Sequence, residues 1–173
     1  MAASTPEEWK TEYPQIKSWG KMTPEILEKK FPWFLKAKVQ YAEIDHDDGN
    51  ENFLIWKKGT WLDGIWKNGN WLDGYWQNGI WEDGIWEDGT WEEGTWKDGL
   101  WYRGTWKDGT WEHGEWRKGT WKKGTWVEGQ HIYGYWQDGT WKNGYWENGT
   151  WKKGKIWDDV TKKLIPSKTP PTK

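Results

Sequence analysis

Tryptophan and glycine recur with a period of five over the middle of the chain. Tryptophan occupies position 56 and every fifth position to 151, except that His131 takes one of these places. Glycine occupies position 59 and every fifth position to 154, and most positions between them are polar. No insertion or deletion interrupts the twenty Trp-x-x-Gly-x units. The pattern defines one repeat region, residues 56–155.

The residue before each glycine predicts tight turns. It is Asp or Asn in eleven of the twenty units. Asx-Gly is typical of two-residue type I′ turns, because glycine adopts a positive φ without steric cost and Asn or Asp tolerate it. Two turn residues leave x-Trp-x for a strand, and Thr, Ile or Tyr often precede the tryptophan. A helix is excluded, since each interior glycine would cost about 1 kcal/mol.

This reasoning predicts a mainly β fold, an antiparallel meander of about twenty three-residue strands joined by two-residue Asx-Gly turns, with a small helical N-terminal cap. With a turn at 68–69, Trp66 faces Trp71, so all indoles share one face of a twisted or coiled ribbon. The expected structural ladder includes Trp61, Trp66, Trp71, Trp76, Trp81, Trp86, Trp91, Trp96, Trp101 and Trp106, with turns at Gly64, Gly69, Gly74, Gly79 and Gly84.

An open row of indoles would exceed the apolar patch that soluble monomers expose, which is at most several hundred Å². The ribbon must therefore coil with the indoles inward or lay that face on another chain. The opposite face collects apolar side chains along one edge. The candidate interface comprises Leu62, Ile65, Leu72 and Tyr75, together with Trp33 and Phe34 from the N-terminal segment. The alternative reading of that edge is an ordinary solvated face.

Three segments are expected. Residues 1–36 are predicted to form a helical docking arm or cap, with helices from about Pro6 to Tyr13 and from Pro24 to Lys30, each preceded by a Thr-Pro-Glu start signal. Residues 37–155 comprise a hairpin, with its turn at 45–51, and the repeat ribbon. Residues 156–173 are predicted to contain a last strand at Ile156–Trp157, then one or two helical turns over 158–164 and a Pro-rich tail that is disordered unless a partner holds it.

Bulk composition restricts the function classes. The chain has 173 residues, 23 tryptophans, no cysteine and a formal net charge of -2. Such a charge argues against nucleic acid as a partner. No apolar run is long enough to cross a membrane, and no secretion signal is expected at the N-terminus. The localisation is left open by these features.

The unit Gly-x-Trp-x-x-Gly, as in residues 64–69, resembles the core of MORN repeats, which are stacked β-hairpins; the longer MORN unit and its Tyr-x-Gly opening are missing here. The strict Trp-x-x-Gly-x spacing of 56–155 is more similar to the tryptophan-rich pentapeptide arrays of tailed-bacteriophage proteins. That resemblance implies a non-catalytic assembly or virion role. The unit differs from the small-residue unit of pentapeptide-repeat β-helices, but a four-sided solenoid with four repeats per coil stays as an alternative. Choline-binding wall modules also use Trp hairpins, at a longer period.

Candidate chemistry is sparse. His46, His113 and His131 have no metal-ligand spacing, and the 45–49 stretch resembles a calcium loop only faintly, so a solvated turn is the alternative. We expect no catalytic residue, cofactor or metal. His131 interrupts the ladder, either as tolerated drift or where the ribbon bends or meets a partner. An acidic block at 82–93 and a basic block at 117–123 form either a solvated surface or a pairing surface between copies.

Two functions from different classes remain. The first is a structural or assembly protein, a Trp-laddered scaffold that contacts protein partners or copies of itself, as in a virion. The alternative is a carbohydrate- or cell-wall-binding module with exposed tryptophans that stack on glycan. Solvent access of the indoles separates them.

Overall fold

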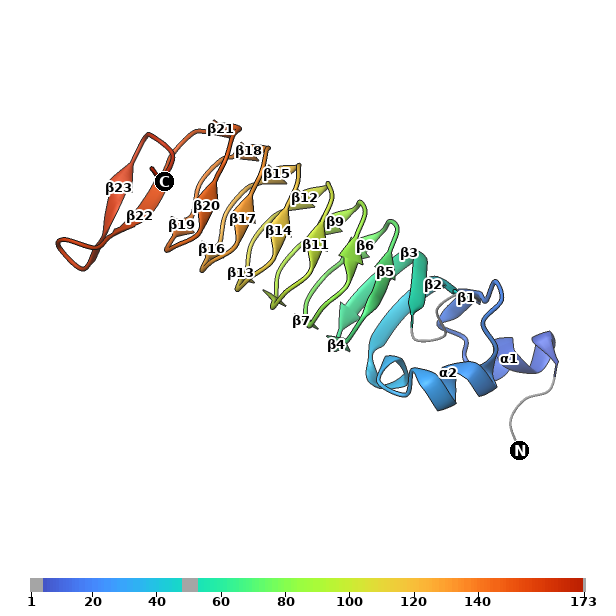
Figure 1. The fold of residues 1–173 in the computed structure, drawn as a ribbon. Helices are drawn as coiled ribbons and strands as arrows, with labels where there is room; N and C mark the ends of the chain where they lie inside the picture. The colour runs from blue at the N-terminus through green and yellow to red at the C-terminus, as the bar shows by residue number, and fades with distance from the viewer. Residues whose placement is uncertain (1–4, 48–52, 173) are drawn as a thin grey trace.

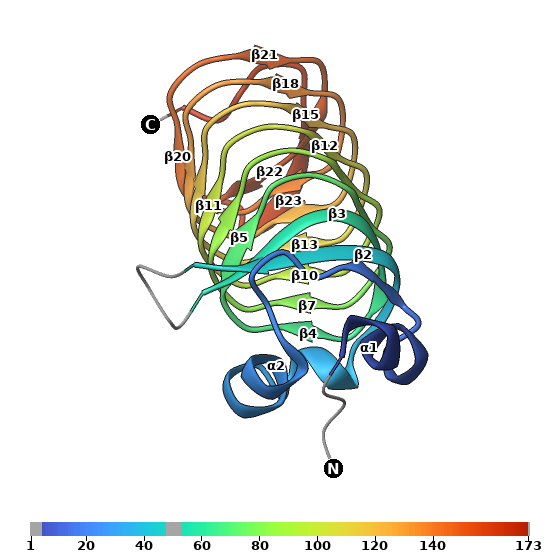
Figure 2. The ribbon, with the colours of Figure 1, turned by 90° about the vertical axis from the view of Figure 1, so that its right-hand side faces the viewer.

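The computed structural model describes residues 5–47 and 53–172 and shows a parallel β-solenoid (Figure 1). The antiparallel meander predicted above is wrong. Trp61 pairs in parallel with Trp76, and Trp76 pairs with Trp91, so each strand lies beside the strand fifteen residues later rather than five. Three repeats make one coil, and the array makes about seven coils. Figure 2 shows the coils stacked along one axis, with the N-terminal helices at one end.

Each coil contributes a short strand to three sides of the solenoid. The first side contains β5 (Gly69–Trp71), β8 (Ile85–Trp86), β11 (Leu100–Trp101), β14 (Glu115–Trp116), β17 (Gln130–His131) and β20 (Tyr145–Trp146). The second contains β6 (Tyr75–Trp76), β9 (Thr90–Trp91), β12 (Thr105–Trp106), β15 (Thr120–Trp121), β18 (Tyr135–Trp136) and β21 (Thr150–Trp151). The third contains β4 (Ile65–Trp66), β7 (Ile80–Trp81), β10 (Thr95–Trp96), β13 (Thr110–Trp111), β16 (Thr125–Trp126), β19 (Thr140–Trp141) and β22 (Gly154–Asp158).

The corners explain why the hairpin prediction failed. A type I′ turn needs a positive φ at both central residues. Within the described array only the glycines from Gly59 to Gly149 have one, from +109° at Gly144 to +144° at Gly134, and the residue before each glycine does not. The Asx side chain instead accepts the glycine N–H, as when Asn68 Oδ1 accepts from Gly69 at 2.8 Å. A single positive φ turns the chain by one corner rather than reversing it.

Backbone hydrogen bonds hold neighbouring coils together. The Thr90 N–H donates to the Gly74 carbonyl at 2.9 Å, and the Glu92 N–H donates to the Trp76 carbonyl at 2.8 Å. The same two bonds recur along the array. They satisfy the polar backbone that strands of two residues would otherwise leave unpaired.

Enclosure of the indoles favours the solenoid over the ribbon. A ribbon leaves one side of its indole row open to water, whereas each coil encloses three aromatic rings, all of them indoles except for the imidazole of His131. Consecutive rings such as Trp91 and Trp96 meet edge to face, with centroids 6.0 Å apart. Three such rings fill the cross-section, so the solenoid has three repeats per coil and not four.

The N-terminal elements form a cap. They are α1 (Pro6–Glu12), β1 (Ile16–Ser18), α2 (Pro24–Lys30), the 3-10 turn η1 (Phe34–Lys36), β2 (Lys38–His46) and β3 (Leu54–Asp63). Both predicted helices and their starts are confirmed: Thr5 and Glu8 form a capping box, and Thr23 accepts from the Ile26 N–H. The predicted hairpin is β2 paired antiparallel with β3, although residues 48–51 of its turn lie outside the described residues.

The C-terminal segment differs from its prediction. The strand at Ile156–Trp157 is confirmed as part of β22. The helical turns expected over 158–164 are wrong, because residues 159–162 form the turn of a hairpin. The disordered tail expected from Ile165 is wrong over its first three residues, which belong to a strand. Residues Lys163–Ser167 form β23, which pairs antiparallel with β22. The Ser167 carbonyl accepts the indole N–H of Trp151 at 3.3 Å. This hairpin therefore continues the third side and closes over the last coil.

Candidate functional site

The most distinctive feature of the molecule is its indole core, defined here as the nineteen tryptophans from Trp56 to Trp151 together with His131. Residues fifteen apart stack in parallel, as Trp91 does on Trp106 with centroids 4.8 Å apart and planes 7° apart. Offset-stacked and edge-to-face contacts are both favourable geometries for aromatic rings. Each indole from Trp56 to Trp136 is 0 % exposed, and the exposed fraction rises only to 8 % at Trp151.

The predicted ladder residues therefore lie together in the interior, in three stacks instead of one file. All ten named tryptophans, Trp61, Trp66, Trp71, Trp76, Trp81, Trp86, Trp91, Trp96, Trp101 and Trp106, belong to it. The named glycines, Gly64, Gly69, Gly74, Gly79 and Gly84, occupy corners with φ between +125° and +141°.

The candidate interface residues are not brought together. Ile65 belongs to the third side, Leu72 follows β5 on the first side, and Tyr75 lies in β6 on the second. Leu62 is half-buried just after the Trp61 position. The single apolar edge assumed for these residues depended on hairpins, and the solenoid distributes them around its circumference.

Phe34 and Trp33 have a different role from the one assigned to them. Phe34 is 1 % exposed, and its ring packs on Trp56 and Trp61 at 6.2 and 6.0 Å between centroids. Trp33 packs edge to face on Trp66 at 5.3 Å. Together they cover the first indole of each of the three stacks. They seal the N-terminal end of the indole core.

The indole N–H groups lie close to backbone of the next coil. Trp101 Nε1 donates to the Lys118 carbonyl, seventeen residues later, at 3.2 Å. Trp106 Nε1 lies beside Gly124, eighteen residues later, but makes no hydrogen bond. Most other ladder Nε1 atoms make no hydrogen bond of good geometry. Only at Trp101 and Trp151 do the indole N–H groups of the core add directional bonds to its packing.

His131 replaces one indole in the first stack. Its ring is fully buried and lies parallel to Trp146 at 3.9 Å and to Trp116 at 6.1 Å. Burial lowers the pKa of His131 to about 3, and the backbone carbonyls of His131 and Asn148 oppose the shift only weakly. The neutral ring therefore acts as a smaller aromatic spacer. The solenoid stays straight through this coil, with the His131 strand paired to both neighbours.

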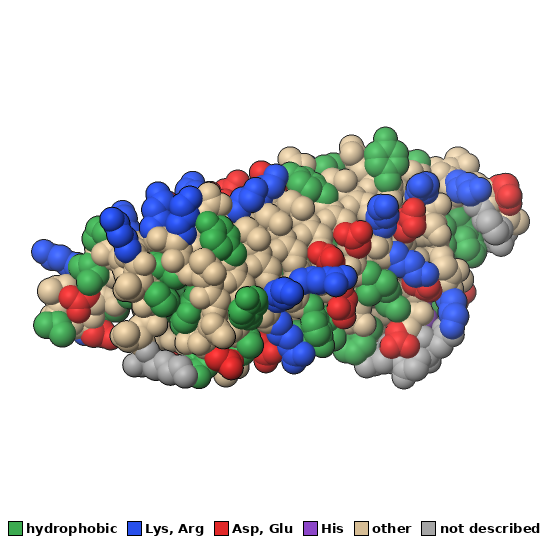
Figure 3. Space-filling view, turned by 90° about the horizontal axis from the view of Figure 1, so that it is seen from above, with side chains coloured by type: hydrophobic (Ala, Val, Ile, Leu, Met, Phe, Trp, Pro, Cys, Tyr) green, Lys and Arg blue, Asp and Glu red, His purple; other side chains and the backbone are tan. Residues whose placement is uncertain are grey.

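Charged side chains pair along the outside, one coil apart (Figure 3). The pairs include Lys107 with Glu92 at 2.7 Å, Arg103 with Asp88 at 2.9 Å, and Lys123 with Asp108 at 2.9 Å. Several side chains of the acidic block at 82–93 and part of the basic block at 117–123 are therefore already paired within one chain. Since exposed pairs contribute at most about 1 kcal/mol each, they set the surface charge more than the stability.

Tyr75, Glu92 and Lys107 form the tightest of these surface clusters. The Tyr75 hydroxyl donates to Glu92, and Lys107 lies 5.7 Å from the centre of the Tyr75 ring. Burial and the Glu92 carboxylate raise the pKa of Tyr75 to about 12. Hydrogen bonds from Lys107 and Tyr75 lower the pKa of Glu92. The cluster links three successive coils on the second side of the solenoid.

In the stretch that resembled a calcium loop, Asp45 has a structural role, while Asp48 and Gly49 lie outside the described residues. Asp45 accepts the N–H groups of Lys21 and His46 and pairs with Lys57. Burial raises the pKa of this carboxyl, but these bonds outweigh it and the pKa falls below its ordinary value. Among residues 5–47 and 53–172, no group of three His, Asp or Glu side chains is placed to hold a metal ion. His113 lies elsewhere, at a corner beside Asp98.

One tryptophan of the C-terminal half departs from the core, and sequence reasoning missed its significance. Ile156 takes the inward register position after Trp141, and Trp157 faces outward with 38 % of its surface exposed. The signal was present in the sequence, because Trp157 stands six residues after Trp151 instead of five.

Comparisons with known proteins do not assign a family. No protein-family model, curated protein or solved structure matches the chain. No helix within the described part of the chain is long and apolar enough to cross a bilayer.

Proposed function

We propose that this chain is a non-catalytic structural protein, a rigid rod that contacts neighbouring subunits in a larger assembly such as a virus particle. The observation that carries the proposal is the continuous indole core, which runs from Trp56 to Trp151 and is at most 8 % exposed at any indole. Repeat proteins of this kind are stabilised by contacts between adjacent units, so their length follows from the number of units.

The two ends of the rod differ, as an oriented component of an assembly requires. At one end Phe34 and Trp33 seal the stacks beneath a helical unit that presents its own outer surface. At the other end the β22–β23 hairpin closes the last coil. We assign docking to the helical unit, because its helices project beyond the solenoid outline (Figure 2).

The alternative, glycan binding along the tryptophan ladder, loses its premise in this geometry. Stacking on sugars needs indoles open to water, and every ladder indole is enclosed. The ladder is therefore assigned to the core and not to a ligand.

The test is the size at which the full chain occurs in extracts of the organism that makes it. Gel filtration followed by quantitative mass spectrometry should place it in a particle far larger than the 20.8 kDa chain, at a fixed ratio to the other proteins of that particle. Elution as a free monomer from the same extract, at low and moderate salt, would contradict the assembly role.

A further inference from the structure

Trp157 is the exposed aromatic that the indole core does not explain. Side chains alternate across a strand, so a shift of one residue moves a side chain from the interior to the surface. Ile156 fills the interior position above Trp141, and Trp157 continues an outward-facing column formed by Val127 and Lys142 in the two preceding coils. No packing requirement of the core places an indole there.

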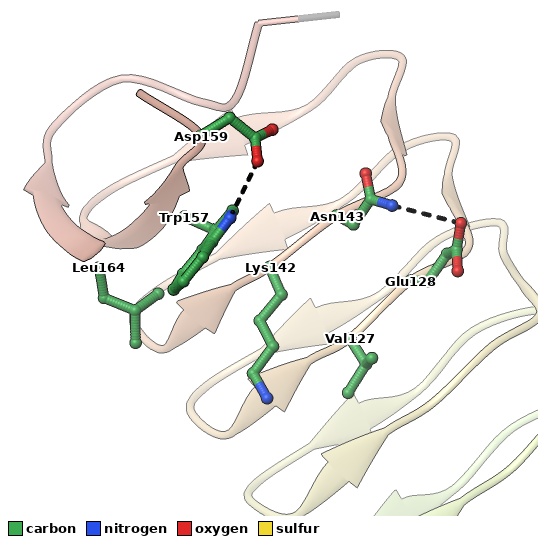
Figure 4. Close-up of a pocket in the computed structure, with 7 residues that line it drawn as sticks. All are labelled: Val127, Glu128, Lys142, Asn143, Trp157, Asp159 and Leu164. Atoms are coloured by element: carbon green, nitrogen blue, oxygen red, sulfur yellow. Dashed lines mark hydrogen bonds between the residues drawn. The ribbon is translucent and has the colours of Figure 1, made fainter. Parts of the chain in front are cut away.

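The indole lies in a groove of about 480 Å³ at the C-terminal end of the third side (Figure 4). We call this the C-terminal groove. It is lined by Val127, Glu128, Lys142, Asn143, Trp157, Asp159 and Leu164, which come from three successive levels of the solenoid. Its volume falls within the range of roughly 300–1,000 Å³ that small-molecule sites occupy.

Hydrogen bonds hold the polar groups around the ring. Trp157 Nε1 donates to Asp159 Oδ1 at 3.2 Å, which fixes the indole on the hairpin. Asn143 Nδ2 donates to Glu128 Oε1 at 3.4 Å on the opposite flank. Leu164, the cross-strand partner of Trp157, adds an apolar wall. The groove thus combines one flat aromatic surface with solvent-accessible carboxylate and amide oxygens.

We propose that the C-terminal groove is a binding site for a neutral saccharide, whose pyranose ring stacks on Trp157 while its hydroxyls bond to Glu128, Asn143 and Asp159. A pyranose has one face of C–H groups, which suits the electron-rich face of an indole, and a rim of hydroxyls that both donate and accept hydrogen bonds. Carboxylates and an amide are suited to those hydroxyls. This inference is independent of the scaffold role and goes beyond it.

The charges of the groove select among saccharides. Glu128 and Asp159 are acidic, but Lys142 also lines the groove and Lys162 Nζ pairs with Asp159 Oδ1 at 3.2 Å, so the formal charges balance. The groove therefore offers no net positive charge to attract phosphate groups or uronic and sialic acids, and the Glu128 carboxylate repels them locally. Neutral hexose or N-acetylhexosamine units carry no such penalty.

The test is titration of the full chain with cellotetraose and with N,N′,N″,N‴-tetraacetylchitotetraose, followed by the indole N–H resonances in ¹H–¹⁵N spectra. The Trp157 signal is assigned as the one lost in Trp157→Phe. We expect this signal to shift with saturable, millimolar affinity for at least one of the two oligosaccharides. Trp157→Ala should weaken binding at least about tenfold, and an oligomer of glucuronic acid should bind more weakly than the neutral ligand.

A matched control separates stacking from a general surface effect. Tyr133→Ala removes an aromatic that is 50 % exposed but lies outside the groove, and it should leave the affinity unchanged. Thermal unfolding of each variant verifies that the solenoid is intact. The proposal is overturned if neither neutral oligosaccharide moves the Trp157 resonance, if binding survives in Trp157→Ala, or if the acidic oligomer binds best.

Discussion

At the scale of single residues, the glycine of each repeat meets two requirements at once. Gly124 has a φ of +121°, and a Cβ built on it would lie 2.5 Å from the Gly109 carbonyl oxygen of the preceding coil. The first requirement is conformational and the second is steric, so no side chain satisfies both. The sequence predicts the positive φ of the glycine, because that requirement is local. It does not predict the close approach between coils, because that approach involves a residue fifteen positions away.

The substitution Gly124→Ala should therefore lower the free energy of unfolding by about 3 kcal/mol, because the backbone must strain or the two coils must separate. Chemical denaturation measures this change. Lys122→Ala, at an exposed position two residues away, should change stability by less than about 0.5 kcal/mol. Equal effects of the two substitutions would show that the corner geometry is misassigned.

His131 gives the core a pH dependence. Its pKa in the folded chain is lowered to about 3 by burial, below the unfolded value of about 6.5. The unfolded state then binds more protons between these two values, so stability falls as pH decreases from about 6.5 towards 3.

We expect the wild-type chain to lose roughly 3 kcal/mol between pH 7 and pH 4 relative to His131→Phe, which keeps an aromatic ring but does not titrate. The difference between the two denaturation curves removes the contribution of the carboxylates that both chains share. Parallel pH profiles for the two proteins would place the His131 ring in contact with water.

At the scale of elements, local sequence signals determine the helices of the N-terminal cap, whereas packing over the whole array determines how the coils pair. The cap helices could be predicted because their start signals, Thr5-Pro6-Glu7-Glu8 and Thr23-Pro24-Glu25, are local in the sequence. The strand pairing could not, because the Asx-Gly dipeptide has the same local signal for a hairpin and for a solenoid corner. Shared burial of nineteen indoles decides between them, and that is a property of the whole array.

The cap is expected to stabilise the whole array through Phe34. Truncation in Phe34→Ala would leave a cavity over Trp56 and Trp61 and should cost about 3–5 kcal/mol. Acrylamide quenching of the tryptophan emission should rise as the terminal indoles open to water. The exposed substitution Tyr41→Ala, on the same unit, serves as the control and should leave both measurements near wild type.

Coil number should set rod length. Removal of the thirty residues 82–111 keeps the five-residue register and deletes two whole coils, so the maximum dimension in small-angle X-ray scattering should shorten by about 10 Å while the chain stays folded. Removal of only the twenty-eight residues 84–111 breaks the register and should lower stability sharply. A folded product of unchanged length from the first deletion would be incompatible with the solenoid.

At the scale of the whole molecule, a dry aromatic interior runs beneath a surface of paired charges. The interior fixes the shape, and the surface carries whatever contacts the chain makes. The sequence predicted that the indoles would be the main stabilising feature, and the structure confirms a tryptophan-laddered repeat protein rich in β-structure. The C-terminal groove escaped prediction because it arises only where the register slips by one residue, at Ile156 and Trp157.

The central claim is that each repeat contacts the repeat fifteen residues later. The chain has no cysteine, so engineered pairs report on this without interference. Thr105 and Thr120 are Cα partners on adjacent coils, whereas an antiparallel hairpin would instead bring Thr105 opposite Glu112. On mild oxidation, Thr105→Cys/Thr120→Cys should form an intramolecular disulfide, detected by peptide mass mapping, and Thr105→Cys/Glu112→Cys should remain reduced. The reverse outcome would contradict the account.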